Sequence, residues 1–236
     1  MEGDDGNGRL VLHVKWSDAE NDYRTFVTRD GLLLGPRWPT RGRNDPRQAV
    51  QFVRTSGVTA VDVVRTFSKF VLTPKEEAIT QALRIVEPAI ERIAPVADDR
   101  SRLYRDAPGG VVLKLRGVAD RVPIGSTGDG MWRMLGLALS ISNAGGGVLL
   151  VDEIDTGLHY SVMENMWRMV SERAAALSVQ VFATTHSRDC YESLAAIAKS
   201  EGGDVTIQRI DRSRTEAVGF STRAIVAAAE RSIEVR

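Results

Sequence analysis

The sequence contains little cysteine, little lysine and no long apolar run. Cys190 is the only cysteine among 236 residues, which excludes an internal disulfide framework and is typical of a reducing cytoplasm. No apolar run approaches the ~20 residues that a membrane-spanning helix needs, and the acidic, glycine-rich start does not resemble a signal peptide. Basic and acidic residues number 31 each, so the overall charge supports binding to neither DNA nor a membrane. We therefore expect a cytoplasmic protein with no membrane contact.

What the sequence does contain is a short apolar run that ends in two carboxylates. Residues 147–151 are small or apolar and predict a strand of a parallel sheet, buried on both faces. Asp152 and Glu153 follow at its carboxyl end, where open α/β sheets bind ligands. An acid at the first position suits Mg²⁺, and one at the second suits orienting or deprotonating a water molecule. The alternative is that the pair forms only a polar turn.

A glycine-rich turn precedes this strand. Gly128, Asp129 and Gly130 stand at the start of an amphipathic helix predicted over 131–142. The glycines let the backbone approach an anion closely, and the free N–H groups at a helix start face phosphate oxygens well. The alternative is an ordinary helix-start turn with Asp129 as its cap.

A second apolar strand follows the carboxylates. Residues 179–185 predict this strand, and a helix over 161–177 joins it to the first in a right-handed βαβ unit. His186 ends the second strand, so its imidazole is expected at the same edge of the sheet as the acids. A purely structural histidine is the alternative. Cys190 comes next, on a helix, as a small buried residue.

These three motifs, in this order, resemble the C-terminal part of the ABC-related AAA-family ATPases, the group that includes the OLD-type proteins. The resemblance covers roughly Val50 to the C-terminus and is strongest to members without an attached nuclease domain. It implies an α/β fold of the P-loop NTPase type, an ABC ATPase head whose sheet has flanking helices. Antiparallel β elements, a small helical lobe and an incomplete N-terminal lobe complete the expected fold.

The resemblance also implies roles for the residues of these motifs. The cofactors would be ATP and Mg²⁺, with Asp152 on the metal, Glu153 as the catalytic base and His186 beside the γ-phosphate or the attacking water. The turn that begins at Gly128 would bind the γ-phosphate of a nucleotide held by the opposite protomer of a head-to-tail dimer. Asp155 falls in the family's D-loop, which crosses that interface. The residues expected to contact nucleotide are therefore Gly128, Asp129, Gly130 and Asp155, with Ser126 as a further contact.

The printed sequence lacks one part of this machinery. An ATPase of this class cradles phosphates in a P-loop, G-x-x-x-x-G-K-[ST], and none of the five lysines follows a glycine. We expect the chain to be a C-terminal portion or one half of a split ATPase, and to bind ATP weakly or not at all by itself. Its expected partner is a second copy or a P-loop-bearing chain; DNA is a conceivable partner without support.

Two other functions are alternatives to an ATP-hydrolysing head. One is a non-catalytic half-head or regulatory module that pairs with a P-loop-bearing partner. The other is a RecA-like or AAA+ motor. Such a motor would also have a strand that ends in paired acids, but it would not explain the glycine turn or Thr184-Thr185-His186.

The rest of the chain divides by composition and pattern. Thr73 to Glu76 predict the start of a helix with a capping box. The arginine-rich loop 36–47 favours a solvated linker over a phosphate- or DNA-contacting loop. The expected regions are a disordered start (1–8), an N-terminal β region (9–57), an inserted helical and β lobe (58–117) and the ATPase core (118–236).

Overall fold

The computed structural model divides the chain into two compact units, residues 1–47 and 48–236. In the first unit it describes only the backbone of three strands. In the second it describes residues 49–96, 110–211, 213–214 and 216–231.

The first unit contains a small antiparallel sheet in the order β1-β2-β3. These strands are β1 (Leu10–Lys15), β2 (Asp22–Val27) and β3 (Leu33–Leu34). The sequence predicts a hairpin over 22–35, and the antiparallel pairing of β2 with β3 confirms it. Its expected turn at Asp30-Gly31, the start 1–8 and the arginine-rich loop 36–47 lie outside the described residues.

The second unit is organised by a three-stranded parallel sheet in the order β4-β8-β9. Its strands are β4 (Val50–Val53), β8 (Val148–Val151) and β9 (Gln180–Ala183). The sequence predicts a strand over 49–57. The β4 strand is shorter, because the chain turns back where the Gly57 N–H donates to the carbonyl of Arg54 at 2.8 Å. The expected N-terminal β region (9–57) includes this strand, but β4 pairs with β8 in the second unit.

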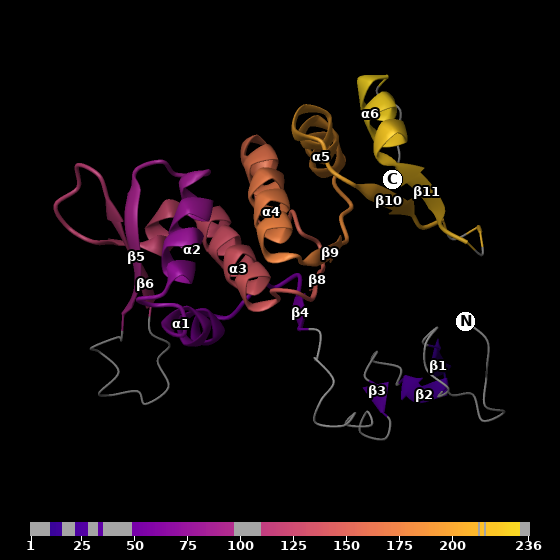
Figure 1. The fold of residues 1–236 in the computed structure, drawn as a ribbon, viewed down its shortest axis with the longest axis horizontal. Coiled ribbons are helices and arrows are strands. Elements are labelled where there is room, and N and C mark those ends of the chain that lie inside the picture. Colours follow the sequence, from indigo (N-terminus) through magenta and orange to yellow (C-terminus); the bar gives the residue numbers. More distant parts are fainter. Residues whose placement is uncertain are drawn as a thin grey trace. The chain divides into compact units, whose positions relative to one another are not determined.

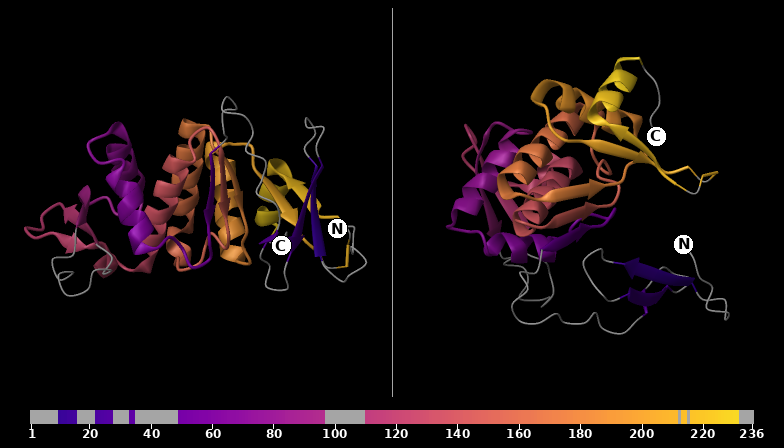
Figure 2. Two further views of the ribbon diagram at one scale, coloured as in Figure 1. Left: turned by 90° about the horizontal axis from the view of Figure 1, so that it is seen from below. Right: turned by 45° about the vertical axis from the view of Figure 1, so that its right-hand side comes forward.

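The helices from α2 to α6 form a row in which each packs against the next (Figures 1 and 2). The connection β8-α4-β9 is the predicted βαβ unit. No helix in the described part of the chain is long and apolar enough to cross a membrane. The helices are α1 (Ala60–Ser68), α2 (Pro74–Arg84), α3 (Asp129–Asn143), α4 (Met163–Leu177), α5 (Arg188–Glu201) and α6 (Thr222–Glu230).

A lobe of α1, α2 and an antiparallel sheet lies between β4 and α3 in the chain. The sheet consists of β5 (Ile90–Val96), β6 (Gly110–Leu115) and β7 (Val122–Pro123). The α2 helix begins as predicted, with Thr73 as N-cap, but the carboxylate of Glu76 accepts the N–H of Leu72 at 2.6 Å instead of that of Thr73. The short helices η2 (Ile124–Thr127) and η3 (Tyr160–Val162) lead into α3 and α4.

At the end of the chain the sequence predicts a hairpin over 205–220 and a short helix over 222–231, and both are present. The strands β10 (Thr206–Arg209) and β11 (Val218–Ser221) pair antiparallel. Helix α6 then packs on α5.

The two faces of the parallel sheet differ. On one face Val53, Leu149 and Val151 are at most 2% exposed and join the main core together with side chains of α3 and α4. On the other face Phe52, Leu150 and Phe182 lie in one row across the three strands, and they are 61%, 36% and 52% exposed. The prediction that β8 is buried on both faces is therefore wrong, because helices of the described residues cover only one of them.

Candidate functional site

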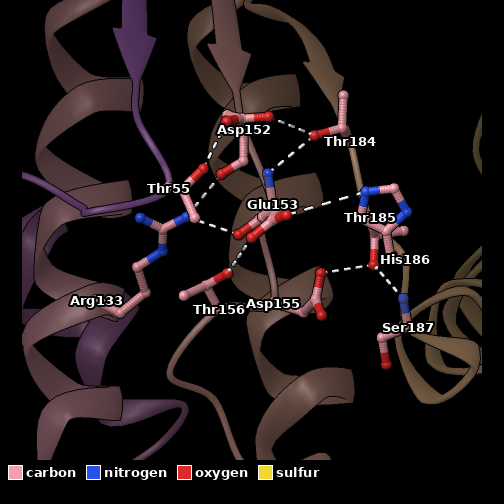
Figure 3. Close-up of polar contacts among 10 residues, drawn as sticks. All are labelled: Thr55, Arg133, Asp152, Glu153, Asp155, Thr156, Thr184, Thr185, His186 and Ser187. Atoms are coloured by element: carbon pink, nitrogen blue, oxygen red, sulfur yellow. Dashed lines mark hydrogen bonds and ion pairs between the residues drawn. The ribbon is translucent and has the colours of Figure 1, made fainter.

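Asp152 lies directly after β8, between the ends of its two neighbouring strands (Figure 3). Thr55, which follows β4, donates its hydroxyl to Asp152 Oδ2 at 2.5 Å. Thr184, which follows β9, donates to Asp152 Oδ1 at 2.9 Å. These two hydrogen bonds lower the pKa of Asp152 against the opposing effect of burial, and the charges of His186 and Arg133 lower it further. Asp152 is therefore an ionised carboxylate at neutral pH.

Glu153 turns out of the strand in a left-handed backbone conformation, with φ +44°. Such a conformation costs about 1–3 kcal/mol for a residue with a side chain and is concentrated at functional sites. The Glu153 N–H donates to Thr184 Oγ1 at 2.9 Å, and Thr156 Oγ1 donates to Glu153 Oε2 at 3.1 Å. The other carboxylate oxygen, Oε1, lies 3.9 Å from His186 Nε2. The turn thus brings an acid and an imidazole together at the carboxyl edge of the sheet.

Both of these groups face solvent. The side chain of Glu153 is 39% exposed and that of His186 is 87% exposed. An exposed acid beside an exposed imidazole is open to a ligand and to water, which a structural ion pair in the core would not be.

Beneath the acids lies a buried guanidinium, that of Arg133 on α3, which is 6% exposed. Its Nη1 donates to the carbonyl of Arg54 at 3.0 Å. Its Nη2 donates to the carbonyls of Asp152 and Glu153 at 3.1 and 2.9 Å (Figure 3). Burial lowers the pKa of Arg133, and the nearby acids, Asp155 first, counter this.

The glycine turn lies at the start of α3, with Gly128 and Asp129 exposed. Gly128 is the N-cap and has φ +92°, a backbone conformation that suits glycine. The alternative with Asp129 as the cap is wrong, because Asp129 is the first residue of the helix and the cap position makes no side-chain hydrogen bond. A Cβ on Gly130 would lie 3.7 Å from the carbonyl oxygen of Gly157, so the turn adjoins the segment that follows the acids.

Asp155 is held by a further threonine, Thr185. Thr185 Oγ1 donates to Asp155 Oδ1 at 2.5 Å, and the N–H of Ser187 donates to Thr185 Oγ1 at 3.0 Å. The segment after Glu153 is therefore tied to the start of α5 as well as to β9.

The structure brings Asp152, Glu153 and His186 together at one edge and leaves the glycine turn on the surface. Sequence analysis missed Thr55 and Thr184 as partners of Asp152, and it assigned no role to Arg133. Thr184 was within reach of prediction, because it lies near the carboxyl end of the strand predicted over 179–185. Thr55 was not, because the pattern gave no sign that β4 pairs with β8.

Residues 17–189, more than half of the chain, match the family described as "AAA domain, putative AbiEii toxin, Type IV TA system". The chain belongs to this AAA-domain family. AAA domains are a class of ATPase domain, so family membership agrees with the ATPase-type domain that the sequence predicts.

One curated relative of this AAA domain is an "ATP/GTP phosphatase" of Helicobacter pylori (strain ATCC 700392 / 26695), 26% identical over 93 residues. The match covers 38% of this chain and spans only 25% of the length of that protein.

Solved structures of SMC ATPase heads show a distant likeness. The SMC head domain from Thermotoga maritima is 13% identical with a TM-score of 0.41, covering 78% of this chain and 65% of that one. An SMC ATPase from work on ATP-driven dimerization and DNA stimulated activation is 13% identical with a TM-score of 0.47, covering 75% of this chain and 99% of that one.

Proposed function

We propose that this AAA domain supplies the hydrolytic side of an ATP site. Glu153 orients or deprotonates the attacking water, and His186 contacts the γ-phosphate or that water. Asp152 holds the Mg²⁺ that accompanies the nucleotide. Gly128, Asp129 and Gly130 contact the γ-phosphate of a nucleotide held by the opposing protomer of a dimer, and Asp155 lies at that interface. The observation that carries the proposal is the pairing of Glu153 with His186, 3.9 Å apart beside an ionised Asp152.

The residues present fit Mg²⁺ held mainly through water and phosphate. The described residues contain no group of three or more His, Cys, Asp or Glu side chains that could hold a metal, which argues against an all-protein metal cage. Mg²⁺ usually keeps several waters and takes one or two carboxylates together with substrate phosphates. One ionised carboxylate flanked by the hydroxyls of Thr55 and Thr184 is such a donor set. When bound, the ion would neutralise phosphate charge.

The substitution Glu153→Gln tests this function. In an assembly that supplies a P-loop, it should lower the rate of phosphate release at least a hundredfold, within the range that general acid–base catalysis contributes. ATP binding should stay within about threefold, because the amide keeps the shape of the carboxylate while losing its basicity. The readouts are phosphate release and nucleotide affinity, measured on the same preparation.

Glu91→Gln is the matched control, because Glu91 is exposed on β5, in the separate antiparallel sheet. It should leave both quantities unchanged. Wild-type turnover in Glu153→Gln would remove Glu153 from the chemistry.

A second function is favoured by the exposed row of Phe52, Leu150 and Phe182. Parallel sheets are normally covered on both faces, so this apolar face suits a module that pairs with a P-loop-bearing partner. In that case the chain need not hydrolyse ATP itself. Phe182→Ser should weaken co-elution with such a partner, whereas Ile210→Ser, at a position 86% exposed beyond β10, should not. Equal co-elution of the two variants would remove this candidate.

A further inference from the structure

Arg133 is a buried charge for which the proposed chemistry has no use. It lies on the second turn of α3, only 6% exposed, and none of its hydrogen bonds goes to a carboxylate. A buried guanidinium is costly unless its donors are satisfied. Here Nη1 and Nη2 donate to three backbone carbonyls, while Nε has no partner among the described residues. The positions of these three carbonyls indicate what the guanidinium does.

The three carbonyls belong to residues that follow neighbouring strands. That of Arg54 comes just before Thr55, the hydroxyl donor to Asp152. Those of Asp152 and Glu153 belong to the two candidate site acids themselves. One planar side chain therefore joins the ends of β4 and β8 to α3.

We propose that Arg133 is a positioning residue of the candidate nucleotide site, an inference that rests on the proposed function. Its guanidinium fixes the left-handed turn at Glu153, and thereby the place of the Glu153 carboxylate beside His186. It also ties that turn to the helix that begins with the glycine turn at Gly128.

The left-handed turn needs such an anchor. The conformation of Glu153, with φ +44°, persists only where surrounding contacts hold it. The N–H of Thr156 donates to the Glu153 carbonyl at 3.0 Å, and Arg133 Nη2 donates to the same oxygen at 2.9 Å. Removing the guanidinium leaves only the Thr156 N–H on the Glu153 carbonyl. The carbonyl of Arg54 keeps the N–H of Gly57, and that of Asp152 loses its guanidinium donor.

Lysine is a poor replacement here. The arginine fork presents donors in a fixed plane, so one side chain reaches two strand ends at once, whereas an ammonium is a compact point charge. The positive charge also lies among three acids, Asp155, Asp152 and Glu153. Their charges raise the pKa of Arg133, whereas burial lowers it. A lysine would keep the positive charge but would not link the ends of β4 and β8.

Because Arg133 connects α3 to the turn at Glu153, a movement of α3 would change the position of the acids. The glycine turn, in which Gly128 and Asp129 are exposed, forms the start of α3, and the buried Arg133 lies on the second turn of the same helix. A ligand that displaces the start of α3 would move the guanidinium, and with it the carbonyls that hold Glu153.

Hydrogen exchange on the full chain without nucleotide tests the anchor directly. In Arg133→Met we expect about tenfold faster exchange at the amides of Ile154 and Thr156, the loss expected when hydrogen bonds from a charged donor disappear. Amides of α4 should keep their wild-type rates. Arg116→Met is the matched control, because Arg116 is exposed beyond β6, and it should change neither set.

The outcomes separate an anchor from a general structural role. Faster exchange confined to residues 153–156 supports the proposal. Wild-type rates there, or a uniform increase across the whole unit, would overturn it. Should Arg133→Met fail to fold, Arg133→Lys decides: a local increase supports the fork, and a wild-type pattern contradicts it.

Turnover provides the second readout. In an assembly that supplies a P-loop, Arg133→Met should lower kcat at least tenfold while KM for ATP stays within threefold, because a misplaced Glu153 affects chemistry more than binding. An unchanged kcat would contradict the positioning role. Because the exchange measurement needs no nucleotide, it can succeed even if the proposed ATPase function fails.

Discussion

At the scale of single residues, the site depends on hydroxyl groups at strand ends. Thr55 and Thr184 each donate to one oxygen of Asp152, and Thr184 also accepts the N–H of Glu153. These short side chains fix the acids without adding charge. They also keep Asp152 ionised, the form that a divalent cation requires.

Thr55→Val should raise the pKa of Asp152 toward its ordinary value, because the hydrogen bond from Thr55 is the largest cause of its lowering. A carboxylate whose folded-state pKa is depressed contributes stability above its unfolded pKa and loses it as the pH falls through the folded pKa. The variant should therefore lose less stability on acidification than the wild type. The measurement is the titration of the Asp152 carboxyl carbon by NMR.

Thr206→Val provides the control for this experiment, since Thr206 is exposed on β10. It should leave the Asp152 titration unchanged. An identical titration in Thr55→Val and the wild type would show that this hydroxyl does not hold the acid.

The sequence predicted the residues that directly follow apolar runs and missed those whose role depends on strand pairing. Asp152, Glu153 and His186 follow two predicted strands that one helix connects, so a shared sheet edge could be inferred. Thr55 and Arg133 act across 97 and 20 positions of sequence, to Asp152 and Glu153, and no local pattern indicates such contacts.

At the scale of elements, β4 and β8 approach so closely that one position admits only glycine. A Cβ on Gly147, just before β8, would lie 2.0 Å from the carbonyl oxygen of Ala49 and 2.7 Å from its nitrogen. These are backbone atoms, which do not rotate away as a flexible side chain would. The Val148 N–H donates to the same carbonyl at 2.8 Å, so the strands must part to admit the extra carbon.

Gly147→Ala should therefore destabilise the second unit by about 1–3 kcal/mol, the usual cost of forcing extra volume into a packed site. Urea unfolding followed by circular dichroism measures this change. Gly145→Ala is the matched control, because a Cβ there meets nothing within 4 Å, and it should change stability little. Equal stability of the two variants would contradict the close approach of β4 and β8.

Element types were largely predictable, whereas the surroundings of an element were not. The predicted helix over 131–142 is α3, with bounds Asp129–Asn143, because its apolar periodicity is strong. The run 147–151 is a strand as predicted, but Leu150 is 36% exposed. An apolar run shows that a segment prefers burial, and it does not show which other element covers each of its faces.

At the scale of the whole molecule, the candidate site is built within one unit, which also has an apolar sheet face that none of its described helices covers. The acids, the threonines and Arg133 all belong to residues 48–236. The dimer, the P-loop and the identity of any partner remain proposals that follow from family membership and from this geometry. For the chain itself we propose that nucleotide phosphates and their metal bind at the carboxyl edge of the parallel sheet.

Paramagnetic relaxation by Mn²⁺ with ATP is the most direct measurement of that claim, because it detects even weak binding to the full chain. We expect Mn²⁺–ATP to broaden the resonances of residues 152–156 and 184–186 strongly, and those of the β10–β11 hairpin little. Asp152→Asn should abolish the selective broadening, since it removes the carboxylate that would hold the ion. Broadening centred elsewhere, or unchanged in Asp152→Asn, would contradict the account.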